Sequence, residues 1–313
     1  MSAAPSHALL RPAIALPFLL IALIWGSTWI VIKDQLAAAP ESWSVTYRFA
    51  IAAVGMFAVA LASERRVRLA AGGQVLAMAI GLAQFCLNFN FVYRAETHIT
   101  SGIVAVLFAL LMLPNALLGR IFLGQTITRR FMAGTAIALG GIALLLVNEA
   151  REAPPTGAVG YGIVLTVLAI FSASAANILQ ASEAARRQPL LLLIAWAMLW
   201  GALFDAAFAL MTAGLPVFPP SARYWGGVAY LGIIGSVVAF PLYFRLIRQL
   251  GPGRAAYNGV LVPVVAMAIS TLLEGYRWSA LAMAGGALAM IGLVVALRGR
   301  EAPVGKAVSA GKP

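Results

Sequence analysis

Long apolar segments recur along the whole chain, and they constrain its fold more than any other feature of the sequence. Of the 313 residues, 62% are hydrophobic and only 10% are charged, whereas a soluble domain carries about 25% charged residues. A helix of about 20 apolar residues spans the hydrocarbon core of a bilayer. We therefore predict an all-α membrane protein rather than a soluble one.

Apolar runs separated by short polar connections predict ten transmembrane helices. They are expected near residues 14–32, 44–61, 75–93, 99–118, 131–147, 159–179, 190–212, 225–244, 255–273 and 280–297. The first run follows Arg11 but is too long for the apolar core of a signal peptide, so a retained helix is expected. Residues 301–313 are predicted to form a disordered cytoplasmic tail.

The 22 Lys and Arg residues orient these helices. If the N-terminus is cytoplasmic, sixteen of them fall in inward regions, and only Lys33, Arg94, Arg151, Arg223 and Arg277 fall in outward connections. Cytoplasmic loops carry an excess of Lys and Arg. The pattern predicts a multi-pass protein of the inner (plasma) membrane with both termini in the cytoplasm, surrounded by membrane lipid.

The positive charge is spread over many short connections. The net charge of +12 therefore does not indicate a nucleic-acid partner, which would need one basic patch with aromatic stacking residues. The expected partner is a small-molecule substrate. The sequence leaves the oligomeric state open, and a monomer is compatible with it.

The two halves of the chain resemble each other. Residues 132–142 read MAGTAIALGGI and residues 283–293 read MAGGALAMIGL, at a constant offset of 151. Residues 1–150 and 151–300 are therefore predicted to form two five-helix repeats. An odd number of spans inverts the second copy, and inverted repeats are typical of secondary transporters with a substrate site near the midplane. The shared Gly and Ala residues are interpreted as helix-packing positions.

The sequence also resembles the ten-helix EamA-type members of the drug/metabolite transporter superfamily. The resemblance rests on Trp25-Gly26-Ser27-Thr28-Trp29 with Lys33, on Leu123-Gly124-Gln125 with Gly134, and on Pro263 and Gly275 with Gly285. The usual Leu-Gly-Glu after the fourth and ninth helices is replaced by Leu-Gly-Gln and Leu-Glu-Gly. Within the superfamily the chain looks most like the YddG type, which implies export of aromatic and other apolar or neutral amino acids by alternating access.

Polar and aromatic side chains at membrane depth are the candidate substrate-binding residues, because such groups face the bundle interior or a wet cavity. Arg48 could bind a carboxylate or snorkel to the surface. Gln84 and Asn88 stand one turn apart and could bind a zwitterion or another helix. The candidate set is Trp25, Ser27, Thr28, Arg48, Gln84, Phe85, Asn88, Phe89, Asn177, Tyr243, Tyr257 and Asn258. The cavity is expected between helices one, three, six and eight, with contributions from two and nine.

Three further residues have candidate mechanical or coupling roles. Pro241 and Pro263 each remove a backbone donor and are predicted to kink or hinge their helices. Asp205 lies within the predicted seventh helix, where it could be a proton-coupling site, a partner of Arg48, an outward-tilted charge or a structural residue.

No catalytic motif is present, so an enzyme is not expected. Neither a metal site nor a cofactor is expected, since the single cysteine, Cys86, has no second thiol. Two alternatives to amino-acid export stay open. A multidrug or other small-metabolite exporter is less favoured, because cation export needs a buried acidic residue and the first helix has none. The other alternative is a membrane scaffold that transports nothing.

Overall fold

The computed structural model describes residues 12–65, 67–152, 158–250, 252–255, 258–273, 275 and 277–297. The predictions for Tyr257 and for the tail at 301–313 lie outside these residues. Within the described ranges the chain is all-helical and contains no β-strand. Hydrocarbon offers no partner to backbone groups, and a helix satisfies its own N–H and C=O groups within one segment.

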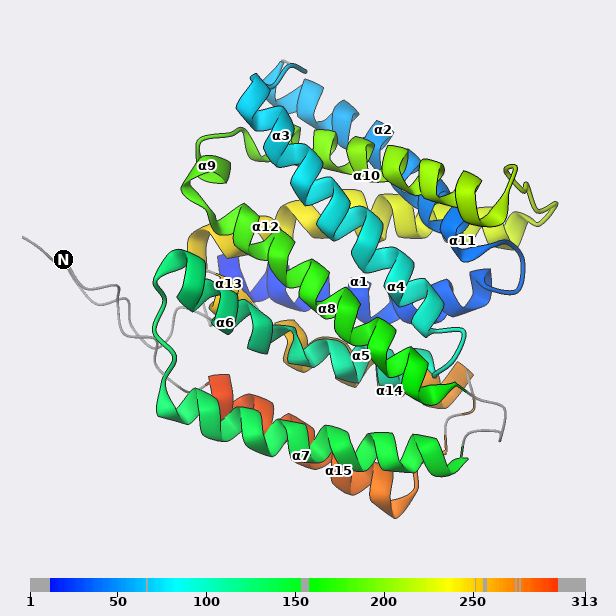
Figure 1. Ribbon diagram of the computed structural model, residues 1–313, viewed down its shortest axis with the longest axis vertical. Coiled ribbons are helices and arrows are strands. Elements are labelled where there is room, and N and C mark those ends of the chain that lie inside the picture. Colours follow the sequence, from blue (N-terminus) through cyan, green and yellow to red (C-terminus); the bar gives the residue numbers. More distant parts are fainter. Residues whose placement is uncertain are drawn as a thin grey trace, which may run out of the picture.

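The helices follow one another with short connections. In the first half they are α1 (Pro12–Gln35), α2 (Glu41–Glu64), α3 (Ala71–Ile80), η2 (Gly81–Leu87), α4 (Asn88–Ala95), α5 (Ser101–Phe108), η3 (Ala109–Leu111), α6 (Met112–Leu123) and α7 (Arg129–Glu152). In the second half they are α8 (Val159–Ala181), α9 (Glu183–Arg186), α10 (Leu190–Ala213), α11 (Ala222–Gly232), η4 (Ile233–Val238), α12 (Ala239–Leu250), α13 (Pro252–Ala255), α14 (Asn258–Leu273) and α15 (Ala280–Leu297). Figure 1 shows the long helices packed side by side.

Seven segments of the described chain are long and apolar enough to cross a membrane. They are Ala15–Gln35, Glu41–Glu64, Ala71–Ala95, Ser101–Leu123, Val159–Ala181, Leu190–Ala213 and Ala222–Gln249. These coincide with the first four predicted spans and with the sixth, seventh and eighth. Two further apolar stretches, Val262–Leu273 and Ala280–Gly292, are shorter. Helices α7, α14 and α15 lie where the fifth, ninth and tenth spans were expected, and the ten-span arrangement stays a prediction.

Two of the seven spans contain a π-helical segment, in which each backbone N–H bonds the carbonyl five residues earlier instead of four. These segments are η2 in the third span and η4 in the eighth. Residues 81–87 shifted by 151 become 232–238, so the two π-helices occupy equivalent positions in the two halves. The offset of 151 that relates the sequences of α7 and α15 therefore also relates the π-helix η2 to the π-helix η4.

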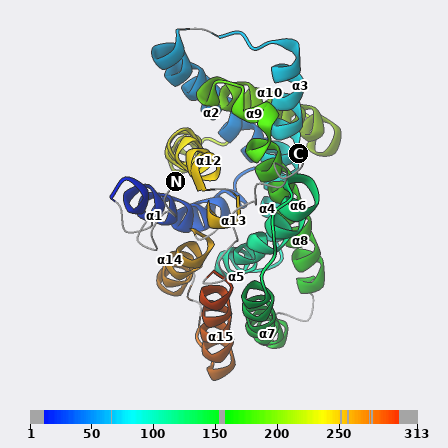
Figure 2. The same ribbon diagram turned by 90° about the vertical axis from the view of Figure 1, so that its left-hand side faces the viewer.

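The α7–α15 pair lies at one end of the molecule in both ribbon views (Figures 1 and 2). A Cβ atom at Gly141 would lie 2.2 Å from the backbone nitrogen of Ala289, and one at Gly292 would lie 2.2 Å from that of Ala138. The offset of 151 exchanges these two contacts, so the pair is symmetric. Only glycine allows such close approach of two helix backbones, which confirms the packing role predicted for the repeated small residues.

The principal contacts of the remaining helices also join the two halves. Helix α2 packs on α10, α1 packs on α14, and α4 packs on α8. Figure 2 shows α1, α4 and α5 from the first half next to α8, α12 and α14 from the second. Residues near the middle of these helices therefore face an interface between the halves.

Candidate functional site

A cavity of about 110 Å³ lies at the interface between the two halves. This volume holds several water molecules, since one water needs about 10–15 Å³ by this measure. The cavity is lined by Trp25, Thr28, Trp29, Ile32, Arg48, Gln84, Asn88, Phe89, Val92, Ala105, Phe108, Ala109, Leu111, Met112, Ala173, Asn177, Phe240, Tyr243, Asn258, Gly259, Val262 and Pro263. An apolar wall with a few convergent polar groups is typical of small-molecule sites.

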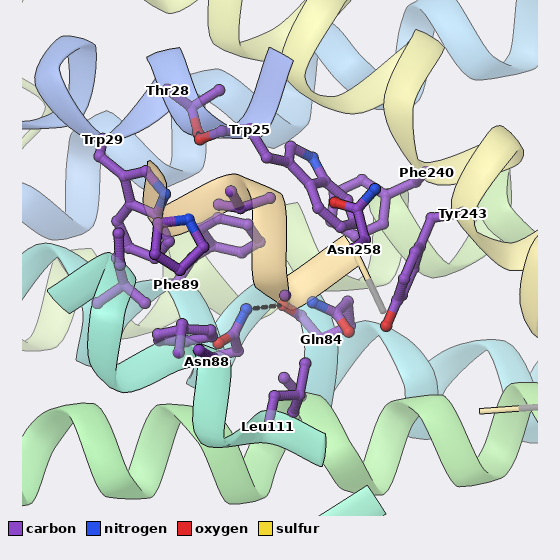
Figure 3. A pocket seen from close by; sticks show the side chains of 18 of the residues that line it. Trp25, Thr28, Trp29, Gln84, Asn88, Phe89, Leu111, Phe240, Tyr243 and Asn258 are labelled. Atoms are coloured by element: carbon purple, nitrogen blue, oxygen red, sulfur yellow. Dashed lines mark hydrogen bonds between the residues drawn. The ribbon is translucent and has the colours of Figure 1, made fainter. Parts of the chain in front are cut away.

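Aromatic rings form much of the wall of this cavity. Figure 3 shows Trp25, Trp29, Phe89, Phe240 and Tyr243 around it, and the Phe89 and Phe240 ring centroids lie 6.3 Å apart. The Trp25 ring centroid lies 5.4 Å from that of Phe240 and 4.8 Å from that of Tyr243. Edge-on and tilted ring pairs at these distances are favourable beyond the area they bury, so the walls are firmly packed.

The two π-helices contribute to the cavity in different ways, η2 with the lining residue Gln84 and η4 with hydrogen-bond partners of two lining residues, Trp25 and Arg48. Gln84 lies in η2, and the indole N–H of Trp25 donates to the backbone carbonyl of Gly235 in η4 at 3.2 Å. Ser236, the next residue of η4, accepts a weak hydrogen bond from Nε of Arg48 at 3.3 Å. π-helical turns occur frequently at functional sites because they leave carbonyl groups outside the regular ladder.

Arg48 is the only charged residue among the described residues that line the cavity, and none of them is acidic. Its side chain does not snorkel, because only 1% of the residue is exposed. The guanidinium carbon lies 4.2 Å from the centroid of the Phe89 ring and 5.2 Å from that of Phe49. The ring faces stabilise the cation, yet Nη1 is buried without a hydrogen-bond partner among the described residues.

Three asparagines of the cavity lining, Asn88, Asn177 and Asn258, each have a buried amide oxygen that lacks a hydrogen-bond partner in the described part of the chain. Their amide nitrogens are engaged elsewhere. The Asn258 nitrogen donates to the Phe18 carbonyl at 2.8 Å, and the Asn88 nitrogen donates to the Gln84 carbonyl at 3.3 Å (Figure 3). Four residues of the cavity lining thus carry a buried polar atom without a partner among the described residues, namely one cationic donor and three amide oxygens.

Nine of the twelve candidate binding residues line the cavity, namely Trp25, Thr28, Arg48, Gln84, Asn88, Phe89, Asn177, Tyr243 and Asn258. Ser27 lies outside it and shares a hydrogen bond of 2.7 Å with the Tyr230 hydroxyl. Phe85 packs behind the wall, with its ring centroid 5.0 Å from that of Phe240. Tyr257 lies outside the described residues.

One of the three residues with predicted hinge or coupling roles lines the cavity, and the other two do not. Pro263 lines the cavity, whereas Pro241 does not. Asp205 lies away from the cavity, where its Oδ1 accepts a hydrogen bond of 2.6 Å from the Asn90 amide. Among the described residues no group of three or more His, Cys, Asp or Glu side chains is arranged to hold a metal.

The sequence reasoning missed the contribution of the fourth span. Five residues of that span line the cavity: Ala105, Phe108, Ala109, Leu111 and Met112. All are apolar, so nothing in their chemistry distinguishes them from residues that face lipid. Phe240 was also missed, although the offset of 151 maps the candidate Phe89 directly onto it. Applying the repeat to each candidate would have found it.

Comparison with protein families identifies the fold. The model of the EamA-like transporter family matches residues 13–147 and again residues 160–298. The chain belongs to the EamA-like transporter family. Such a match, together with the apolar helices, makes it a multi-pass membrane protein and indicates a transporter rather than an enzyme.

Curated relatives resemble the chain over much of its length. Protein PagO of Salmonella typhimurium is 22% identical, over 94% of this chain and 96% of its own. A probable amino-acid metabolite efflux pump of Escherichia coli is 26% identical, over 91% of this chain and 95% of its own. A probable terminal-alkyne amino-acid exporter of Streptantibioticus cattleyicolor is 26% identical, over 69% of this chain and 70% of its own.

One solved crystal structure has the same fold. It superposes with a TM-score of 0.68 at 20% identity and covers 90% of this transporter and 95% of its own chain. At this identity the likeness concerns the fold alone.

Proposed function

We propose that this transporter exports amino acids with apolar or aromatic side chains through the central cavity. The observation that carries the proposal is the set of unsatisfied polar atoms, which comprises Nη1 of Arg48 and the amide oxygens of Asn88, Asn177 and Asn258. A buried polar group without a partner costs about 1–3 kcal/mol. An amino-acid zwitterion satisfies both kinds at once, because its carboxylate accepts from Arg48 and its ammonium group donates to the amides.

The remaining wall suits the side chain of such a substrate. Trp25, Trp29, Phe89, Phe240 and Tyr243 surround the polar groups with aromatic surface. Transfer of apolar area from water to this surface stabilises binding at about 25 cal/mol per Å². The names of two relatives, an amino-acid metabolite efflux pump and an amino-acid exporter, support the same substrate class.

The proposed mechanism is alternating access between two inverted five-helix halves, residues 1–150 and 151–300. The equivalent π-helices and the symmetric α7–α15 contact support this division. We propose ten spans in the inner membrane with both termini in the cytoplasm, on the strength of the Lys and Arg distribution. The cavity then alternates between the two sides of the membrane as one half rocks against the other.

Flux into liposomes tests the substrate. Purified protein should move labelled phenylalanine, tryptophan, methionine or threonine, and Arg48→Gln should reduce this flux at least tenfold because the carboxylate loses its charged partner. Arg187→Gln is the matched control, since Arg187 lies outside the cavity in an exposed pair with Glu183. If no amino acid shows protein-dependent flux, the proposed substrate class is wrong, and export of another small molecule or a non-transporting scaffold stays open.

Asp205 is the proposed site of coupling to protons. It is the buried carboxylate of α10, with no exposed surface, and its Oδ2 lacks a hydrogen-bond partner among the described residues. In liposomes with an imposed pH gradient, Asp205→Asn should abolish gradient-driven accumulation and leave substrate exchange intact. Accumulation at the wild-type level in this variant would assign Asp205 a structural role.

Export of organic cations is the rival function. A cation site needs a buried carboxylate in the cavity, whereas the described lining contains Arg48 and no acidic residue. Tetraphenylphosphonium should therefore neither move nor compete with phenylalanine in the same liposomes. If tetraphenylphosphonium competes with phenylalanine and this competition is lost in Asp205→Asn, export of organic cations would be the better description.

A further inference from the structure

A second cavity, which we call the side groove, lies next to the central one. It has a volume of about 530 Å³ and is bounded by α5, η3, α7, α14 and α15. Its wall is apolar except for Thr271, whose hydroxyl accepts a hydrogen bond of 2.8 Å from the Trp278 indole and donates to the Met267 carbonyl. The side groove therefore offers hydrocarbon surface and no unsatisfied polar group to a ligand.

The side groove opens on the outer surface of the helices. Val264 and Leu272, which line it, are exposed by 51% and 81%. Helices α7 and α15 pack mainly on each other and have few contacts with α5 and α14, and the side groove lies between this pair and the rest of the bundle. Figure 2 shows the α7–α15 pair next to α5 and α14. In a membrane this opening faces lipid.

A thin seam separates the side groove from the central cavity. Ala109 and Pro263 line both spaces. A Cβ atom at Gly259 would lie 3.7 Å from the Ala109 Cα, so α14 passes directly against η3 at this point. The two residues that line both spaces are small, so no large side chain separates the side groove from the central cavity at these positions.

Both helices of the seam are irregular where they meet. Helix α5 changes to the 3₁₀ segment η3 at Ala109–Leu111. In α14, Pro263 lacks the N–H that would bond the Gly259 carbonyl. A 3₁₀ stretch within a longer helix often marks a hinge, and both helices have fewer regular backbone hydrogen bonds at this level. Irregular backbone of this kind is where we expect a displacement of α14 against η3 to open the seam.

We propose that the side groove is a second binding site, which takes the aliphatic chain of an amphiphilic amino acid whose head lies in the central cavity. The inference rests on the proposed function, because Arg48 and the amides hold the head. From there the chain crosses the seam between Ala109 and Pro263. The substrate class therefore includes amino acids with alkyl side chains that are too long for the central cavity.

Chain length is the first test. In nanodiscs, 2-aminodecanoic acid and 2-aminobutanoic acid compete against labelled phenylalanine, with free concentrations corrected by protein-free nanodiscs. Each methylene that leaves water for an apolar site raises affinity about fourfold, so the long acid should bind at least a hundredfold more tightly. Equal affinities would overturn the inference and leave the proposed function standing. If neither acid competes, the proposed function itself fails.

A groove-filling variant is the second test. Val264→Trp fills the side groove without touching the central cavity, and Val54→Trp places the same side chain on an exposed face of α2, where Val54 is 73% exposed. Val264→Trp should weaken the long acid at least tenfold and leave the short acid unchanged. Unchanged affinity of the long acid, or an equal loss with Val54→Trp, would contradict the inference.

Photolabelling locates the chain directly. A 2-aminodecanoic acid with a terminal diazirine should label peptides of α14 and α15 that line the side groove, and unlabelled acid should remove this label. Adducts confined to α1 and α4 would place the chain in the central cavity and overturn the inference. So would labelling of the side groove by a diazirine phospholipid that the acid fails to displace, because bilayer lipid would then be the occupant.

Discussion

Asp205 illustrates how the bundle holds a carboxylate away from water. Its Oδ1 accepts a hydrogen bond of 2.6 Å from the Asn90 amide, which also donates to the Cys86 carbonyl at 3.0 Å. Asn90 lies in α4 and Asp205 in α10, so the bond joins two spans at a depth where neither side chain can reach solvent. Within the membrane such a bond fixes which faces of the two helices meet.

Removing this bond should destabilise the protein. Asp205→Ala removes the acceptor of the Asn90 amide at a buried site, so we expect the free energy of unfolding to fall by about 1–3 kcal/mol. Asp205→Asn should cost less, because an amide oxygen still accepts from Asn90. Thermal unfolding in nanodiscs measures both variants.

Asp34→Ala is the control for this comparison, because Asp34 is partly exposed and pairs with Arg223 at 2.6 Å. An exposed ion pair contributes about 0–1 kcal/mol. Equal losses for Asp205→Ala and Asp205→Asn would show that the hydrogen bond to Asn90 contributes nothing.

At the scale of single elements, the π-helix η2 lies unusually close to α10. A Cβ atom at Gly81 would be 2.5 Å from the Ala197 carbonyl oxygen, and one at Gly201 would be 2.5 Å from the Phe85 Cβ. Two glycines on facing helices thus allow contact between the backbones. Because Gln84 lies in η2, this contact also positions a side chain of the cavity.

A side chain added at one of these glycines should push η2 and α10 apart. Gly201→Ala forces its methyl group against Phe85, and overpacking of this kind costs about 1–3 kcal/mol. Gly226→Ala in α11 is the control, since nothing lies within 4 Å of its added Cβ, and it should stabilise by about 0.5–1 kcal/mol through helix propensity. Melting temperatures that change in the same direction would refute the close-packing interpretation.

Pro263 belongs to the same scale, because it interrupts the hydrogen bonding of α14. Pro263→Ala restores a backbone donor for the Gly259 carbonyl, so the helix should become stiffer. If α14 bends during transport, maximal flux should fall several-fold and the affinity for substrate should stay within about twofold of wild type. Flux and affinity measured in liposomes separate these effects, and wild-type flux would exclude a hinge at Pro263.

On the scale of the whole molecule, the α7–α15 pair is a symmetric unit at the edge of the bundle. Its glycine contacts exchange under the offset of 151, so Gly141 and Gly292 have equivalent surroundings. The pair also forms one side of the side groove. Loss of its packing therefore affects both the assembly of the two halves and the second site.

The symmetry predicts matched effects for matched substitutions. Gly141→Leu and Gly292→Leu should each separate the two helices and lower the melting temperature by similar amounts, because each added Cβ would approach a backbone nitrogen at 2.2 Å. Gly140→Leu should be nearly neutral, since the nearest atom to its added Cβ is a leucine methyl at 3.8 Å. Strongly unequal effects at Gly141 and Gly292 would contradict the two-fold relation.

Much of this protein follows from its sequence alone. Apolar length specifies membrane-crossing helices, because hydrocarbon admits only segments that satisfy their own backbone groups. The duplicated Gly and Ala pattern indicated helix-packing positions, which the α7–α15 contact confirms. The scarcity of polar residues at membrane depth singled out Arg48 and asparagines that line the cavity, and their role in binding stays a prediction. These features could be inferred because each depends on local chemistry or on spacing within one helix.

Other properties were decided only by tertiary structure. The fourth span lines the cavity with apolar residues such as Phe108 and Ala109, and in a membrane protein the lipid face and the cavity face have the same composition. Ser27 and Phe85 turn away from the cavity for a related reason, since rotation of a helix about its axis depends on its neighbours. The side groove likewise exists only through the relative placement of α7, α14 and α15, which no single segment encodes.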